Sequence, residues 1–276
     1  MTIMDQNERL NILVDRFKED SIQYKNLTVG DSEEDKKVAL RSLMNIRMPR
    51  KMDEATLLIQ DEYLQERMRK IGEVTLDDIP TLKELGSGHP YAEKMSIWQG
   101  DITRLKTDAI VNAANSQMLG CFIPMHTCID NCIHTYAGIQ LREECNRQMR
   151  RLTEVYGPGY EQPTAEPMLT DGYNLPAKKV VHIVGPIVDG WLTKEQEQQL
   201  SDCYSKTLDM CMENGLRSVA FCCISTGVFH FPNDRAAAIA VETVSNWLKD
   251  HEDQIDRVIF NVFKDEDKEY YEKELL

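Results

Sequence analysis

The chain has 276 residues, of which 42% are hydrophobic, and its formal net charge is −14. This length is enough for one large domain or for a domain with a sizeable extension. The negative charge argues against a nucleic-acid partner, because surfaces that bind nucleic acid obtain most of their affinity from lysine and arginine. No apolar run reaches the roughly 18 residues that a membrane helix needs, and no signal peptide opens the sequence. We therefore expect a cytoplasmic protein without a membrane partner.

The N-terminal third is helical and charged. Residues 54–68 (EATLLIQDEYLQERM) carry apolar side chains at helical spacing. The sequence GSGHP at 86–90 predicts a linker, since glycine and proline interrupt regular structure. We therefore predict a helical N-terminal extension over residues 1–92 and a main domain over residues 93–276. The extension is expected to stabilise the main domain rather than to perform chemistry.

After residue 92, short apolar strands alternate with helices. The strands are expected at 108–112, 180–184, 218–224 and 257–262, and the helices at 129–149, 201–214, 234–248 and 265–274. Strands that are apolar throughout are typical of a sheet covered on both faces. The alternation predicts an α/β fold, a three-layer α/β/α sandwich with a largely parallel central sheet. Ligands of such sheets bind at the carboxyl ends of the strands.

A cysteine and histidine cluster follows the first of these strands. Cys121, His126 and Cys128 form a C-x4-H-x-C pattern, which supplies two thiolates and one imidazole. Three such ligands suit a zinc ion whose fourth position stays open, as in catalytic zinc sites. The alternative is that the cysteines pack as small hydrophobic side chains. Cys132 lies one helical turn after Cys128 and is a possible fourth ligand, although we expect it to face the core.

Four motifs in order resemble the macrodomain family, whose members bind ADP-ribose. They are GDIT at 100–103, TDAIVNAAN at 107–115, YNLPAKKVVHIVGP at 173–186 and STGVFHFP at 225–232. The resemblance covers about residues 95–265. It implies that Asp101, with Ile102 beside it, binds adenine and that Asn115 contacts the distal ribose. It also implies a diphosphate loop, which consists of Ser225, Thr226, Gly227, Val228 and Phe229.

One departure from the family pattern carries the prediction of activity. The glycine-rich loop that usually follows the NAAN motif is replaced by residues 120–128, which contain the cysteine and histidine cluster. This feature resembles a zinc-containing microbial branch of macrodomains with a helical N-terminal extension. The resemblance implies a zinc-dependent hydrolase, with one Zn²⁺ per chain, that removes mono-ADP-ribose from proteins. Asn115 and Asp130 are the candidate catalytic residues, with Asp130 orienting a water molecule or taking its proton.

The resemblance also implies a partner and leaves two other functions open. In this branch the substrate is typically a lipoyl-carrier protein that a sirtuin-like transferase has modified. A non-catalytic reader of ADP-ribose would use the same binding motifs, because a fold does not by itself imply catalysis. An O-acyl-ADP-ribose deacylase would use the same pocket with a different leaving group. His182 lies within a buried strand pattern and is expected to be structural.

Overall fold

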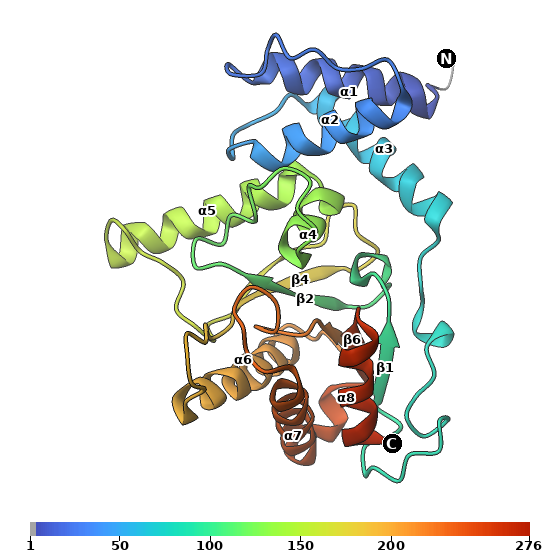
Figure 1. Ribbon diagram of the computed structural model, residues 1–276, viewed down its shortest axis with the longest axis vertical. Helices are drawn as coiled ribbons and strands as arrows, with labels where there is room; N and C mark the ends of the chain where they lie inside the picture. Colours follow the sequence, from blue (N-terminus) through green and yellow to red (C-terminus); the bar gives the residue numbers. More distant parts are fainter. Residues whose placement is uncertain (1–3) are drawn as a thin grey trace. The chain divides into compact units, whose positions relative to one another are not determined.

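The computed structural model describes residues 4–276 and divides them into two compact units (Figure 1). The helical unit comprises the residues up to Gly72, together with Leu119–Pro158 and Tyr173–Leu175. The sheet unit comprises Glu73–Met118, Gly159–Gly172 and Pro176–Leu276. The chain therefore passes between the units several times.

The sheet unit is built on six strands in the order β1-β6-β5-β2-β4-β3. The strands are β1 (Met95–Gln99), β2 (Ala109–Ala114), β3 (Met168–Asp171), β4 (Lys179–Val184), β5 (Ser218–Phe221) and β6 (Arg257–Val262). Every neighbouring pair is parallel except β3 and β4, which are antiparallel. The central strands consist almost entirely of buried residues. The parallel strands consequently end at a common edge of the sheet.

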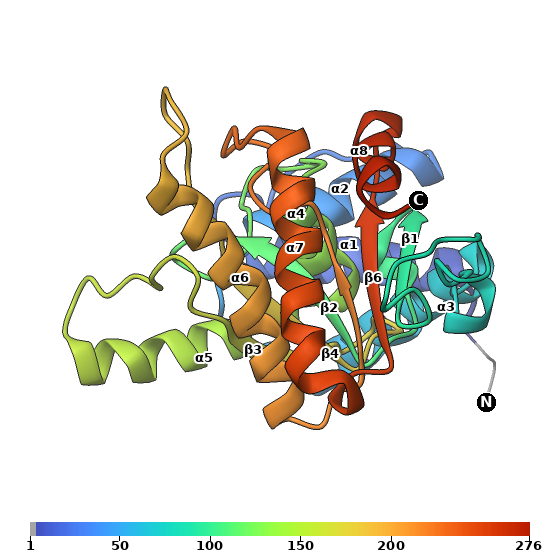
Figure 2. The same ribbon diagram turned by 90° about the horizontal axis from the view of Figure 1, so that it is seen from below.

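Three long helices of the sheet unit lie on one face of this sheet (Figures 1 and 2). They are α6 (Lys194–Glu213), α7 (Asn233–His251) and α8 (Asp265–Leu275). Helix α7 contacts both of the others, and α8 also contacts β1 and β6. Tyr204 of α6 is fully buried and its ring lies 4.8 Å from the ring of Phe221 in β5. Aromatic contacts of this kind join the helices to the sheet.

The described part of the helical unit, from residue 4 onward, contains five helices. They are α1 (Gln6–Asp20), α2 (Glu33–Ile46), α3 (Glu54–Ile71), α4 (Ile129–Ala137) and α5 (Ile139–Tyr156). Their shared core is formed by buried aliphatic and aromatic residues from α1, α2, α3 and α5, among them Leu13, Phe17 and Leu43. Each of the first three helices begins at a residue whose side chain accepts a backbone hydrogen bond from the first turn. Such caps satisfy amide groups that the helix itself leaves unpaired.

The structure confirms the predicted α/β class and the largely parallel sheet, and it corrects three details. The helix predicted over 129–149 is two helices, because Gly138 has a φ of 96° that interrupts the helical path. The strand predicted over 218–224 ends at Phe221. Strands β1 and β3, at the two edges, were not predicted. A domain boundary at residue 92 stays a prediction. Within residues 4–276, no helix is long and apolar enough to cross a membrane.

Candidate functional site

Three of the predicted motifs lie at the same edge of the sheet unit. Asp101 follows β1 after one glycine, Asn115 directly follows β2, and the loop that begins at Cys222 follows β5. These three strands run parallel within one sheet. Their carboxyl ends therefore bring the adenine, ribose and diphosphate candidates to one edge, which is where α/β sheets bind ligands.

Asp101 is held in place by its own turn. Its Oδ1 accepts hydrogen bonds from Thr103 N at 3.0 Å and from Thr103 Oγ1 at 2.6 Å. The preceding Gly100 is required by a close approach, because a Cβ at that position would lie 2.6 Å from the indole of Trp98. The carbonyl of Gly100 accepts from Asn261 Nδ2 at 3.0 Å. Because Oδ1 accepts both bonds from Thr103, Oδ2 of Asp101 can accept a hydrogen bond from a ligand. Ile102, the residue beside it, is buried.

Asn115 and Asn112 of the NAAN motif have different environments. Asn115 is half-buried, and its Oδ1 accepts from the backbone N–H of Gln117 at 3.1 Å. Asn112 is fully buried and its Nδ2 lies 3.0 Å from Nδ1 of His182. Burial lowers the pKa of His182 to about 3, which keeps the imidazole neutral. The expectation that His182 is structural therefore agrees with its surroundings in the sheet unit.

The loop from Ser225 to Phe229 begins at a buried residue with a strained backbone. Ser225 has a φ of 64°, an uncommon conformation for a residue with a side chain. Its Oγ is buried and has no hydrogen-bond partner among the residues that the structure describes. By contrast, a Cβ at Gly227 would meet no atom within 4 Å, and the Val228 side chain is 71% exposed. The loop leads into the first turn of α7, whose N-terminal amides favour an anion. Thr226 and Phe229 are half-buried.

Phe263 is a site candidate that was not predicted from the sequence. It directly follows β6, the strand next to β1, and its side chain is 76% exposed. The adjacent Val262 carbonyl accepts from the N–H of Gly100 at 3.0 Å. The backbone that carries Phe263 is therefore held beside the Asp101 turn, and its exposed ring is available to stack on a base. Its position immediately after a mostly buried strand is the signal in the sequence that could have identified it.

The helical unit brings the predicted metal ligands together. One ligand atom from each of Cys121, His126 and Cys128 lies within 4.8 Å of the other two. The Cys121 Sγ and His126 Nδ1 atoms are 3.7 Å apart. Tetrahedral zinc with ordinary bond lengths of about 2.3 Å to sulfur and about 2.0 Å to nitrogen places such atoms about 3.6 Å apart. The donor set and its spacing therefore fit zinc.

The cluster is fixed at the start of α4. Cys128 is the N-cap of this helix, and its Sγ accepts from the N–H of Asn131 at 3.4 Å. Burial raises the pKa of the Cys128 thiol to about 12, and the neighbouring Cys121 and Asp130 act in the same direction. Burial therefore disfavours a free thiolate at Cys128, and a bound cation would stabilise the deprotonated form.

Asp130 and Cys132 occupy the first turn of α4. Asp130 is buried, and its Oδ1 lies 3.5 Å from Nε2 of His134. The Cys132 Sγ does not belong to the cluster of three ligands; it lies 3.9 Å from the Thr127 carbonyl and 3.8 Å from Arg41 Nη2. Cys132 is half-buried, and the expectation that it faces the core stays a prediction. The cluster therefore offers three protein ligands.

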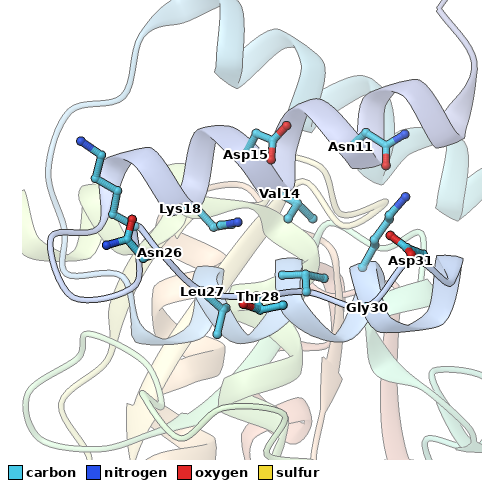
Figure 3. Close-up of a pocket in the computed structure, with 12 residues that line it drawn as sticks. Asn11, Val14, Asp15, Lys18, Asn26, Leu27, Thr28, Gly30 and Asp31 are labelled. Carbon is cyan, nitrogen blue, oxygen red and sulfur yellow. The ribbon is translucent and has the colours of Figure 1, made fainter.

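A cavity of about 720 Å³ opens elsewhere in the helical unit, between α1 and residues 25–31 (Figure 3). The amine of Lys18 points into it, while Asp15 and Asp31 lie at its margin. None of the predicted site residues lines this cavity.

Comparison with known proteins agrees with these features. The Macro domain family model matches residues 111–240. A protein-ADP-ribose hydrolase of Treponema medium is 45% identical over 98% of this chain and 99% of its own length. A protein-ADP-ribose hydrolase of Staphylococcus aureus is 39% identical over 99% of this chain and 97% of its own length.

Solved structures give the same result. The Trypanosoma brucei macrodomain in complex with ADP-ribose matches with a TM-score of 0.64 and 28% identity, over 84% of this chain and 94% of that one. The Oceanobacillus iheyensis macrodomain matches with a TM-score of 0.58 and 35% identity, over 67% of this chain and 93% of that one. From its motifs, its sheet and these relatives, the chain belongs to the macrodomain family.

Proposed function

We propose that this chain is a zinc-dependent hydrolase that releases ADP-ribose from mono-ADP-ribosylated proteins. Two relatives that align along nearly the whole chain carry the name protein-ADP-ribose hydrolase. The observation that carries the zinc requirement is the meeting of Cys121, His126 and Cys128 ligand atoms within 4.8 Å of one another. Three ligands leave a coordination position for water or substrate, as in catalytic zinc sites.

The sheet-unit residues would bind the nucleotide. The Asp101 carboxylate, with Oδ2 available, would accept from the adenine amine beside Ile102, and the exposed ring of Phe263 would stack on the base. The loop from Ser225 to Phe229 would hold the diphosphate through backbone amides. Asn115 would bind the distal ribose through its amide. These contacts position the ligand without any lysine or arginine, which agrees with the strongly negative charge of the chain.

The helical-unit residues would supply the chemistry. Cys121, His126 and Cys128 would hold one zinc ion. When bound, zinc lowers the pKa of a coordinated water or polarises a substrate oxygen. Asp130 is buried and lies two positions after the ligand Cys128 in the sequence. Its carboxylate would orient the attacking water or accept its proton. A lipoyl-carrier protein as the modified partner stays a prediction from the family resemblance.

One experiment tests this proposal. The protein is stripped with a chelator, verified as metal-free by elemental analysis, and reconstituted with zinc. Release of ADP-ribose from a modified protein should disappear on stripping and return on reconstitution, whereas affinity for free ADP-ribose should change less. Undiminished turnover in the metal-free protein would reject the zinc requirement. Tight binding without turnover in any metal state would instead identify a reader, and turnover of O-acyl-ADP-ribose alone would identify a deacylase.

A further inference from the structure

Helix α2 of the helical unit contacts the metal-ligand loop, which we define as residues 119–128. Arg41 and Asn45 are one helical turn apart on α2 and lie about 80 residues before the loop in sequence. Arg41 is half-buried and Asn45 is 1% exposed. Both side chains form hydrogen bonds with groups of the loop or of α4, so they are candidates for holding the metal ligands in place.

Two backbone groups next to the His126 side chain are bound by α2, namely the N–H of Met125 and the carbonyl of His126. Asn45 Oδ1 accepts from the N–H of Met125 at 3.0 Å. Arg41 Nη2 donates to the carbonyl of His126 at 2.8 Å and to Asn131 Oδ1 at 3.1 Å. Met125 has a φ of 58°, a conformation that costs energy for a residue with a side chain and persists only where the surroundings enforce it. The hydrogen bond between the Met125 N–H and Asn45 helps to hold Met125, the residue before the ligand His126, in this conformation.

Asn131 and Arg142 extend this set of hydrogen bonds to the two cysteine ligands. The Nδ2 of Asn131 donates to the Ile123 carbonyl at 2.9 Å, and its backbone N–H donates to Cys128 Sγ at 3.4 Å. Arg142 of α5 donates to the Asn45 carbonyl at 2.7 Å and to the Cys121 carbonyl at 3.3 Å. A chain of hydrogen bonds therefore connects α2 to the backbone or sulfur of each ligand.

We infer that Arg41 and Asn45 are positioning residues that preorganise the metal-ligand loop for zinc. This inference rests on the proposed function, because it assumes that the cluster binds zinc. Groups that bind and orient metal ligands typically change metal affinity by about 10- to 100-fold when they are removed. The N-terminal helices would then tune the metal site in addition to burying apolar surface.

The test compares Arg41→Met with Arg67→Met in the full chain. The Arg67 guanidinium stacks on the ring of Tyr136 in α4 at 3.5 Å, so its replacement also removes a half-buried cation next to α4. It does not remove a bond to the metal-ligand loop. Zinc affinity is measured by competition with a chromophoric chelator, and the free energy of unfolding is measured on the metal-free proteins. Arg41→Met should bind zinc about 10- to 100-fold more weakly, and Arg67→Met should bind it like the parent.

The outcomes separate this inference from the proposed function. Equal zinc affinity in Arg41→Met and the parent overturns the positioning role, even if the variant is less stable. A parent chain that binds no zinc overturns the proposed zinc site, and the inference falls with it. If Arg41→Met does not fold, Arg41→Lys carries the test, because it keeps the cation and the aliphatic stem but not the guanidinium geometry. Arg41→Lys is expected to bind zinc with intermediate affinity, and parent-like affinity there overturns the inference.

Discussion

Asn112 and His182 face each other across the parallel strands β2 and β4, with the Asn112 amide nitrogen 3.0 Å from Nδ1 of the imidazole. An amide nitrogen can only donate, so Nδ1 must accept and the proton of the neutral ring lies on Nε2. Nε2 is 2.9 Å from Thr170 Oγ1 in β3. Three strands are therefore joined by a single uncharged side chain.

This arrangement predicts that the protein loses stability in mild acid. The pKa of His182 is lowered by burial from 6.5 to about 3 in the folded chain. Between these values the unfolded chain binds more protons, so the contribution of His182 is complete above pH 6.5 and declines as the pH falls towards 3. At pH 5 the loss amounts to about 2 kcal/mol.

Urea unfolding of the parent and of His182→Gln at pH 7 and pH 5 checks this expectation. Glutamine offers one acceptor and one donor group but cannot ionise, so the variant should lose less stability between the two pH values. His230→Asn serves as the control, because His230 is exposed and its φ of 57° suits asparagine. The control should keep the pH dependence of the parent. An unchanged pH dependence in His182→Gln would contradict the assignment.

Cys128→Ser and Cys132→Ser should differ in metal content. Serine is a favourable N-cap residue, so Cys128→Ser can preserve the start of α4 while removing a thiolate ligand. We expect a large loss of bound zinc in this variant. Cys132→Ser should retain one zinc per chain, because the Cys132 Sγ lies outside the cluster of three ligands. Elemental analysis of the dialysed proteins measures both, and equal zinc loss in the two variants would make Cys132 a fourth ligand.

Asp101→Ala should weaken binding of ADP-ribose by about 1.5 to 3 kcal/mol, the usual range for a hydrogen bond to a charged group. Thr103→Val is the matched control, because it removes the 2.6 Å bond to Asp101 Oδ1 but leaves the carboxylate for the adenine amine. Isothermal titration calorimetry should find a smaller loss in the control. Parent-like affinity in Asp101→Ala would show that adenine binds elsewhere.

The sequence predicted the central strands better than the edges of the sheet. Strands β4 and β6 are rich in valine and isoleucine and almost entirely buried, and such segments are distinctive because both faces are covered. The edge strands β1 and β3 are short and contain polar residues, so no alternating or apolar pattern marks them. The break between α4 and α5 was missed because amphipathic spacing continues through Gly138, whose φ of 96° is visible only in the structure.

The candidate site was predictable where its residues are close in sequence. Cys121, His126 and Cys128 lie within eight consecutive positions, so their spacing alone predicted a shared metal. The contacts of Arg41 and Asn45 were not predictable, because about 80 residues separate them from the loop and no local pattern records that pairing. Residues that support a site from a distant helix become visible only through tertiary structure.

Phe263→Ala should weaken ADP-ribose binding with little effect on folding. The side chain is 76% exposed, so truncation removes little buried area. Stacking of a base on an aromatic ring contributes about 1 to 3 kcal/mol. Phe263→Trp keeps a ring and should retain most of the affinity. Calorimetric titration and thermal unfolding of both variants measure the two effects. If the Phe263→Ala and Phe263→Trp variants both bind ADP-ribose as tightly as the parent, the ring does not contact the base.

Gly185→Ala should destabilise the sheet unit through the candidate diphosphate loop. A Cβ at position 185 would overlap Ser225 Oγ and lie 2.7 Å from Ile224 Cγ2. Crowding of this kind in a packed interior costs about 1 to 3 kcal/mol. Gly227→Ala is the matched control, because its Cβ would enter open space in the same loop. Urea unfolding should find Gly227→Ala close to the parent in stability.

The double variant Gly185→Ala/Ser225→Gly locates the cause of that loss. Glycine at 225 removes the overlapping hydroxyl and suits the φ of 64° that Ser225 adopts. The destabilisation in the double variant should therefore be smaller than the sum of the two single effects, as is usual for residues in direct contact. Rescue should be incomplete, because Ile224 still crowds the new methyl group. Additive losses in urea unfolding would mean that Gly185 and Ser225 do not compete for the same space.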